Sequence, residues 1–242
     1  MDSSTPSLSV NNLIGISSLS NQYFALRHGQ SKANIAKIIS SDPAISTIEH
    51  GLTDVGKDQV AASAIKFCRD YSNERNGDVP VAIFSSDFTR ARETASIFAQ
   101  LLHENKIPLL FNEDDEDVFG VKLETRLRER YFGQFNGQSD SHYQDVWDVD
   151  CMDADHTEFD VESVNSVVKR TSDLIIDLET KFDMAAREDA TNDRLKVILV
   201  AHGDVLQILQ TAFLRRNGSV HRSLEHLETA GVRELRLQDN LK

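Results

Sequence analysis

The sequence contains few cysteines, no long apolar run and no excess of basic residues. Two cysteines occur among 242 residues, Cys68 and Cys151, and their spacing does not match a metal-binding motif. No apolar run approaches the roughly 18 residues that a membrane-spanning helix needs. The first dozen residues lack the basic start and the apolar core of a signal peptide. These absences predict a cytoplasmic protein with no membrane partner and no metal site.

The net charge of the chain is −13, from 39 acidic and 26 basic residues. Nucleic acids and anionic membranes bind to basic surfaces, so this balance predicts neither kind of partner. A small phosphorylated substrate is still compatible with the charge, because the arginines nearest to a cleft set its local potential.

Short apolar runs alternate with segments in which apolar residues recur at helical spacing. The runs 23–26, 81–84 and 196–201 predict buried strands, each followed by a helical pattern, and residues 232–237 alternate like an edge strand. This alternation predicts an α/β protein, a three-layer α/β/α fold with a mostly parallel central sheet.

The length of the chain fits one domain with an inserted cap. We expect residues 1–22 to form a flexible N-terminal tail and residues 23–242 to form the domain, with a cap-like insertion around 112–160. The acidic stretch from Asp145 to Asp160 predicts a solvated loop. It lacks the spacing and the glycine of a calcium-binding loop, so a metal site there is disfavoured.

Three predicted strand-to-helix turns carry residues that suit a phosphate group. They are Arg27-His28-Gly29, the stretch from Ser85 to Arg90, and the stretch from Ala201 to Asp204. The carboxyl ends of parallel strands lie at one edge of a sheet, so the turns are predicted to converge. Two histidines and two arginines in one pocket imply an anionic ligand. Gly29 is expected to let the backbone approach that ligand closely.

Five motifs, in order, resemble those of the histidine phosphatase superfamily, also called the phosphoglycerate-mutase-like family. The resemblance extends from Phe24 to about Leu237, and its motifs are Arg27–Asn34, Leu52–Gln59, Ser85–Ala95, Leu127–Gly137 and Val200–Gly203. It implies the phosphoglycerate-mutase-like fold and a phosphatase of the metal-independent type, with no cofactor.

The resemblance also implies a role for each matching residue. His28 would attack phosphorus and form a phosphohistidine, and Glu129 would act as general acid and then as general base. Arg27, Arg90 and His202 would hold the phosphoryl oxygens in the transition state. The full set expected to bind phosphate or substrate is Arg27, Ser31, Asn34, Arg90, His202 and Gly203.

Some of these residues also have structural interpretations. Without the resemblance, Glu129 between arginines would be interpreted as a surface ion pair. His221 and His226 lie in a polar segment without a partner pattern, and structural or solvated roles are expected for them.

Three functions compete for this set of residues. A cofactor-dependent mutase would need cations next to Trp147 to hold a substrate carboxylate, whereas Asp145, Asp148 and Asp150 stand there and would repel it. A catalytically inactive phosphate-binding protein would lack the nucleophile or the acid, and both are present. The sequence therefore favours a phosphomonoester hydrolase. Its acidic cap suggests a substrate with little negative charge beyond the phosphate, either a sugar phosphate or a phosphorylated side chain. The oligomeric state stays open.

Overall fold

A five-stranded sheet forms the centre of the molecule, with the strand order β3-β2-β4-β1-β5. The computed structural model describes residues 10–73, 79–110, 119–182 and 194–239. The strands are β1 (Gln22–Arg27), β2 (Val81–Ser85), β3 (Lys122–Leu123), β4 (Lys196–Ala201) and β5 (Val232–Leu235). Strands β1 to β4 are parallel, and β5 pairs antiparallel with β1 at the edge. The predicted mostly parallel α/β sheet is confirmed, and strands β1, β2 and β4 begin within one residue of the predicted runs.

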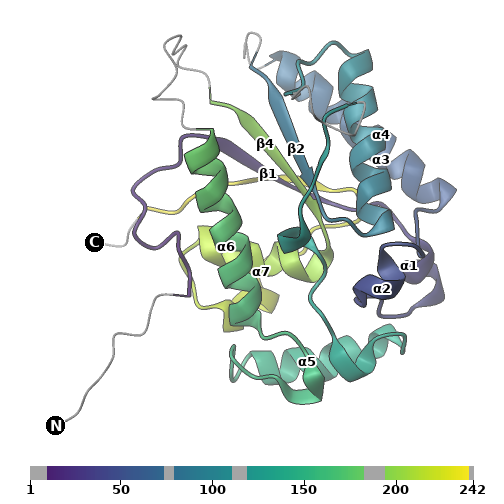
Figure 1. The fold of residues 1–242 in the computed structure, drawn as a ribbon, viewed down its shortest axis with the longest axis vertical. Helices are drawn as coiled ribbons and strands as arrows, with labels where there is room; N and C mark the ends of the chain where they lie inside the picture. Colours follow the sequence, from purple (N-terminus) through teal and green to yellow (C-terminus); the bar gives the residue numbers. More distant parts are fainter. Residues whose placement is uncertain (1–9, 74–78, 111–118, 183–193, 240–242) are drawn as a thin grey trace.

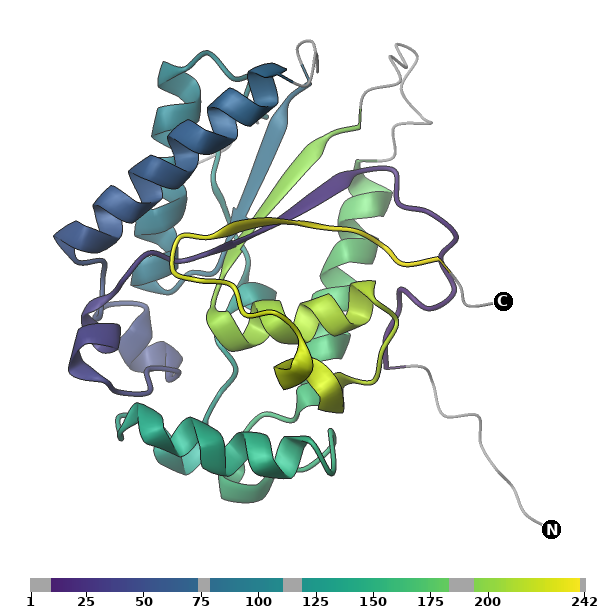
Figure 2. The same cartoon turned by 180° about the vertical axis from the view of Figure 1, so that it is seen from behind.

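Helices cover both faces of the sheet (Figures 1 and 2). Helices α3 (Asp54–Asn73) and α4 (Thr89–Glu104) pack on one face, and α6 (Val164–Lys181) and α7 (Gly203–Phe213) pack on the other. Alternate side chains of each strand point to opposite faces. In β4, Ile198 and Val200 therefore belong to the α3/α4 core. Val197, Leu199 and Ala201 belong to the α6/α7 core. The two apolar cores confirm the predicted three layers.

The predicted flexible tail is wrong for its second half. Residues 10–21 lie against the α6/α7 layer, where the side chains of Leu13 and Leu19 are buried. The side chain of Asn11 donates a hydrogen bond to the carbonyl of Ala212 over 3.0 Å, and the carboxylate of Glu179 accepts one from the backbone of Asn21 over 3.1 Å. Burial of two leucines offsets the entropy lost in ordering this segment. The rest of the predicted tail, residues 1–9, lies outside the described residues.

The predicted cap needs a similar correction. Residues 112–118 lie outside the described part of the chain, and β3 falls inside the expected insertion although it pairs with β2 in the sheet. The cap proper follows β3. It consists of α5 (Tyr143–Asp150) and short 3-10 turns at Thr125–Leu127, Gly133–Phe135, Asp140–His142 and Glu158–Asp160.

The cap has a small apolar core of its own, which it shares with the segment after β1. That segment carries α1 (Lys32–Ala36) and α2 (Pro43–Ser46), and its Ile39 is buried with Phe132 and Val146 of the cap. In Figure 1, α1, α2 and α5 lie together below the sheet. This shared core places the cap over the end of the sheet at which the parallel strands finish.

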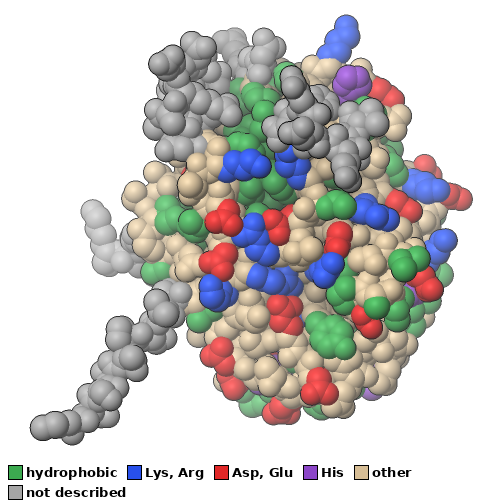
Figure 3. All heavy atoms as spheres, in the orientation of Figure 1, with side chains coloured by type: hydrophobic (Ala, Val, Ile, Leu, Met, Phe, Trp, Pro, Cys, Tyr) green, Lys and Arg blue, Asp and Glu red, His purple; other side chains and the backbone are tan. Residues whose placement is uncertain are grey.

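Charged side chains of both signs are mixed on the surface. On the face seen in Figure 3, Lys and Arg side chains lie among Asp and Glu side chains, so no continuous basic surface forms there. Among the described residues, no helix combines the length and the apolar character needed to cross a bilayer.

Two glycines fix the contact between the first turn and α3. A Cβ atom on Gly29 would lie 2.5 Å from the carbonyl oxygen of Gly56, and a Cβ atom on Gly56 would lie 2.1 Å from that of Gln30. Neither position leaves room for a side chain. The expected purpose of Gly29, close approach of a ligand, is therefore corrected: the space beside it is filled by α3.

Gly56→Ala is expected to lower the free energy of unfolding by about 1–3 kcal/mol, because the added methyl group overlaps backbone that cannot move away cheaply. Gly15→Ala is the matched control, since nothing lies within 4 Å of a Cβ atom at Gly15. Urea unfolding of the two variants and the wild type measures the difference. Equal stabilities for both variants would contradict this account of the contact.

Candidate active site

A cavity of about 260 Å³ lies at the carboxyl ends of β1, β2 and β4, beneath the cap. The structure thus brings together residues from all three predicted turns. Those predicted from the sequence that line the cavity are Arg27, His28, Ser31, Asn34, Arg90, Glu129 and Gly203. His202 lies behind them, with its ring centroid 5.2 Å from that of His28.

The imidazole of His28 is buried and its hydrogen bonds define its tautomer. Its Nδ1 lies 2.7 Å from the carbonyl oxygen of Gly29, which can only accept, so Nδ1 carries a proton. Its Nε2 accepts a hydrogen bond from Nε of Arg90 over 3.2 Å and is therefore unprotonated. Burial lowers the pKa of His28 well below its ordinary value, and the charges of Arg90 and Arg27 lower it further. A neutral Nε2 with a lone pair is the form that can act as a nucleophile.

Two arginines flank this imidazole, and hydrogen bonds to other parts of the chain hold their guanidinium groups in place. Arg90 donates from Nη2 to the carbonyl of Ser40 over 2.8 Å, and its guanidinium lies 5.2 Å from the ring centroid of Phe88. Arg27 donates from Nη1 to Nε2 of His226 over 2.6 Å and to the carbonyl of Leu227 over 2.9 Å. Because His226 accepts this bond, its Nε2 carries no proton. Burial lowers the pKa values of both arginines, because it disfavours their charged forms.

His202 contributes a second buried imidazole. Its Nε2 lies 2.9 Å from Oγ of Ser86, at the end of β2. Its Nδ1 is buried and has no hydrogen-bond partner among the described residues. Burial lowers the pKa of His202 well below its ordinary value, and the charge of Arg90 adds to this effect.

The remaining predicted phosphate-binding residues form the edge of the cavity. Ser31 caps α1, because its Oγ accepts from the backbone of Asn34 while the Asn34 side chain accepts from the backbone of Ser31 over 2.9 Å. Gly203, the first residue of α7, has the guanidinium of Arg27 beside it, and a Cβ atom there would lie 3.2 Å from Cζ of Arg27. The lack of a side chain at Gly203 therefore makes room for Arg27.

Glu129 is a partly buried carboxyl group on the cavity wall, with its Oε1 accepting a hydrogen bond from the backbone of Arg130 over 3.0 Å. Burial raises the pKa of Glu129 to about 7, and the negative charge of Asp204 adds to the increase while Arg90 opposes it. A carboxyl group with this pKa exchanges protons near neutral pH. The alternative interpretation as a surface ion pair is not supported, because the neighbouring Arg130 binds Asp150 and Arg128 binds Asp87.

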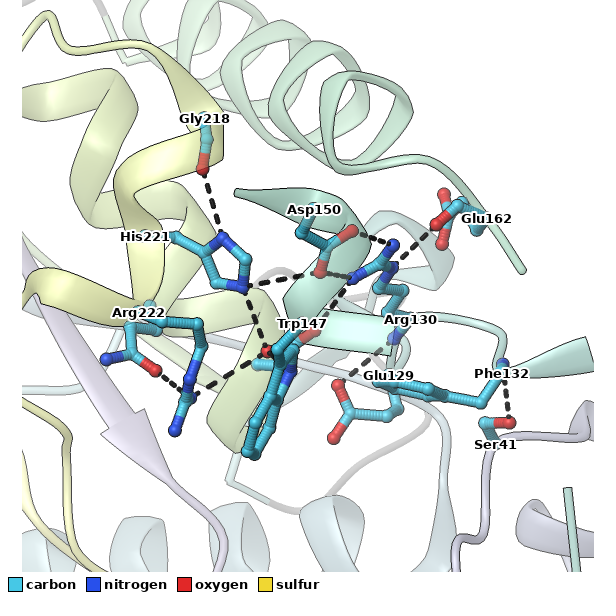
Figure 4. A network of polar contacts seen from close by, with 12 residues as sticks. Ser41, Glu129, Arg130, Phe132, Trp147, Asp150, Glu162, Gly218, His221 and Arg222 are labelled. Atoms are coloured by element: carbon cyan, nitrogen blue, oxygen red, sulfur yellow. Dashed lines mark hydrogen bonds and ion pairs between the residues drawn. The ribbon is translucent and has the colours of Figure 1, made fainter. Parts of the chain in front are cut away.

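A network of buried charges lies beside Glu129 (Figure 4). The guanidinium of Arg130 is fully buried and binds both carboxylate oxygens of Asp150, over 2.6 and 2.7 Å. His156 also contacts Asp150, over 2.6 Å. Asp204 lies 3.5 Å from Arg130 and from Nε2 of His221. This network joins the cap to the first turn of α7, and so fixes the backbone that carries Glu129.

The predicted solvated acidic loop is therefore wrong at its start. Residues 143–150 form α5, and Asp150 is completely buried against Arg130. Asp145 and Asp148 are exposed, and they bind His142 and Gln144 respectively. None of these three aspartates lines the cavity, so the argument that they repel a substrate carboxylate fails. The helical period places Asp145 and Asp148 on the outer face of α5 and Asp150 on its inner face, whereas Tyr143 and Trp147 line the cavity.

Several cavity residues were not among the individual site residues predicted from the sequence: Ser40, Asp140, Tyr143, Trp147, Asp204, Arg222 and His226. Asp204 lies in the third predicted turn, two residues after His202, which is a phosphate-binding residue predicted from the sequence. Arg222 and His226 follow α7 in a segment without periodicity, and only the tertiary fold brings them to the cavity. Within the described ranges no group of three or more His, Cys, Asp or Glu side chains is arranged to hold a metal ion.

The chain belongs to the histidine phosphatase superfamily (branch 1), whose family model matches residues 23–242. This confirms the family predicted from the motifs. No curated protein sequence matches the chain.

Solved structures share its fold. Mycobacterial glucosyl-3-phosphoglycerate phosphatase in complex with VO3 has a TM-score of 0.66 and 22% identity, over 88% of this chain and 90% of that one. Phosphoserine phosphatase from Entamoeba histolytica in complex with 3-phosphoglyceric acid has a TM-score of 0.60 and 19% identity, over 88% of this chain and 89% of that one.

Arg130→Met is expected to lower the free energy of unfolding by about 3–5 kcal/mol, because it leaves the buried carboxylate of Asp150 without its main partner. The double variant Arg130→Met/Asp150→Leu should recover much of this loss. Lys66→Met is the control: its pair with Asp70 is exposed and contributes at most about 1 kcal/mol. Chemical unfolding monitored by circular dichroism decides, and a small effect of Arg130→Met would show that the network does not hold the cap.

Proposed function

We propose that this protein is a phosphomonoester hydrolase that forms a phosphohistidine at His28 and uses Glu129 as general acid and base. The observation that carries the proposal is the protonation state of the side chains that line the cavity. A neutral imidazole with a bare Nε2 shares the cavity with two arginines and with a carboxyl group whose pKa is about 7. These are a nucleophile, an electrophilic cradle and a proton donor for one reaction.

In the first step, Nε2 of His28 attacks phosphorus and the bond from phosphorus to the ester oxygen breaks. The protonated carboxyl group of Glu129 gives its proton to the departing alkoxide, which leaves as an alcohol. Arg27 and Arg90 hold the non-bridging oxygens, on which negative charge is concentrated in the transition state. His202 supports His28 from behind and offers its second nitrogen to the phosphoryl group.

In the second step, water attacks the phosphoryl group on His28. Glu129, now a carboxylate, takes a proton from this water as the bond between Nε2 and phosphorus breaks. Inorganic phosphate leaves, and both His28 and Glu129 return to their starting protonation states. The chain's own cationic side chains supply the electrophilic field throughout, so the proposed reaction is metal-independent and needs no cofactor.

The names of the similar structures agree with this reaction class. One is a phosphatase in complex with VO3 and another is a phosphatase in complex with 3-phosphoglyceric acid. For this chain they support a small phosphorylated molecule as the substrate.

The mutase alternative keeps one observation in its favour. Arg222, a cation, lines the cavity near Trp147, where a mutase would hold a carboxylate. Product analysis separates the two reactions: with 3-phosphoglycerate and a trace of 2,3-bisphosphoglycerate, a phosphatase releases inorganic phosphate and forms little 2-phosphoglycerate. Isomerisation faster than phosphate release from any ester would establish the mutase instead.

His28→Ala is expected to abolish phosphate release and covalent labelling, because the nucleophile is lost. Rapid quench of the wild type with a phosphorus-labelled ester should trap an acid-labile, base-stable phosphoprotein. His103→Ala is the control, since His103 lies on α4 outside the cavity. Normal turnover by His28→Ala would refute the assignment.

The pH dependence tests Glu129. Its raised pKa means that the acid form is present below about pH 7 and is lost above it, so kcat/KM for alkyl phosphates should fall as pH rises through 7. Glu129→Gln should remove this limb and lower turnover of alkyl phosphates about 10²–10⁴-fold. Turnover of p-nitrophenyl phosphate should fall much less, because its leaving group needs little protonation. Glu158→Gln, an exposed position in the cap, serves as control, and equal losses on both ester types would indicate a structural role.

A further inference from the structure

The cavity contains a third arginine beyond the two that flank His28. Arg222 belongs to the 3-10 segment Gly218–Ser223, which follows α7, and it lines the cavity together with Trp147 and His226. Its side chain is 31% exposed. Arg27 and Arg90 lie next to the proposed nucleophile and are the cations for the phosphoryl group. Arg222 is a third cation on the wall of the same cavity, with no part in the proposed mechanism.

The guanidinium of Arg222 is held in place before any substrate binds. Its Cζ lies 3.6 Å from the ring centroid of Trp147, and its Nη1 donates a hydrogen bond to Oε1 of Gln207. Trp147 in turn is fixed, because its Nε1 donates to Oδ1 of Asp204 over 3.1 Å. Figure 4 shows Arg222 beside the indole of Trp147. A side chain that is ordered in advance loses little entropy when it binds a ligand.

The charge of Arg222 is only partly neutralised by the protein. The nearest carboxylate oxygen in its ion pair is Oδ1 of Asp204, at 4.0 Å. That carboxylate also accepts the bond from Trp147 and lies 3.5 Å from both His221 and Arg130. Its negative charge is therefore shared among several partners. Burial lowers the pKa of Arg222, and the charges of Asp204 and Asp150 offset this effect only in part.

The other acidic groups of the cavity wall do not compete for the same position. Glu129 faces the reacting phosphoryl group in the proposed mechanism. Asp140 is held against the end of α1, where its backbone N–H donates to the carbonyl of Lys37 over 2.9 Å. An anionic substituent of the substrate is therefore favoured on the side of Trp147 and Arg222 and disfavoured on the side of Asp140.

We propose that Arg222 binds a carboxylate of the substrate, so that the enzyme prefers phosphomonoesters of small hydroxy acids to those of neutral alcohols. This inference rests on the proposed phosphatase function. A guanidinium offers planar paired donors that match a carboxylate, and the contact with Trp147 holds the guanidinium of Arg222 at the cavity wall. The proposal replaces the expectation, drawn from the acidic cap sequence, of a substrate with little charge beyond its phosphate.

Two pairs of esters that differ in one carboxylate test the wild type. They are 3-phosphoglycerate against glycerol 3-phosphate, and phosphoserine against phosphoethanolamine. An ion pair with charge-assisted hydrogen bonds should give the carboxylate-bearing member at least about a tenfold higher kcat/KM, mainly through a lower KM. A wild-type ratio of one or less in both pairs overturns the assignment, whatever any variant does.

Substitution of Arg222 then connects the preference to this side chain. Arg222→Met keeps an unbranched stem against Trp147 and removes the charge, so the ratio within each pair should fall toward one. Arg222→Lys keeps the charge without the planar donors and should retain part of the preference. Arg236→Met is the matched control. The side chain of Arg236 is 80% exposed, pairs with Glu234 and does not line the cavity. An unchanged ratio in Arg222→Met overturns the proposal.

The experiment separates this inference from the function on which it rests. If the wild type releases no phosphate from p-nitrophenyl phosphate in a His28-dependent way, the proposed phosphatase is wrong. Calorimetric affinities of wild type and Arg222→Met for 3-phosphoglycerate and glycerol 3-phosphate then still decide the role of Arg222. If Arg222→Met does not fold, the Arg222→Lys variant and the two wild-type ratios decide.

Discussion

The repulsion of positive charge at the carboxyl end of the sheet is the constraint on which the site depends. Arg90 is buried and Arg27 is partly buried beside the imidazole of His28. Burial of this imidazole lowers its pKa, and the charges of the two arginines lower it further, so the imidazole is neutral. The backbone carbonyls of Ser40 and Leu227 accept hydrogen bonds from the two guanidinium groups and help to hold these cations in place. The same charges that lower the pKa of His28 are available for a phosphoryl group, so in the proposed reaction one arrangement would serve both the free protein and the transition state.

The position of Glu129 depends on a second electrostatic arrangement, at the boundary between cap and sheet. The paired charges of Arg130 and Asp150 are fully buried, and Asp204 of α7 lies close to the same guanidinium. This network fixes the backbone next to Glu129, and the charge of Asp204 contributes to the raised pKa of Glu129. The cap therefore does more than cover the cavity: its helix α5 supplies Asp150, the partner of Arg130, and so holds the backbone next to Glu129 in place.

In the proposed function, the groups that select the substrate come from other elements than the groups that act on phosphorus. Arg27, His28 and Arg90 lie at or shortly after the ends of β1 and β2, whereas Tyr143, Trp147 and Arg222 come from the cap and from the segment after α7. Such an arrangement allows the reacting residues to stay constant while the surrounding wall determines the alcohol portion of the ester.

The sequence by itself determined four of the five strands, the three turns and the family, because these strands and their following helices have local periodicity and the motifs are contiguous. It did not determine the two-residue strand β3, which is too short to show a period. It did not determine the course of α5. Asp145, Asp148 and Asp150 are three aspartates in one short segment, and nothing local distinguishes them. Only Asp150 points inward, because the helical period directs it at Arg130. It also did not place Arg222, which is 75 residues from Trp147 in the chain. Ordering of residues 10–21 likewise required knowing which helices they cover. Contacts between segments without periodicity are decided by packing and charge across the whole fold, so only the tertiary structure revealed them.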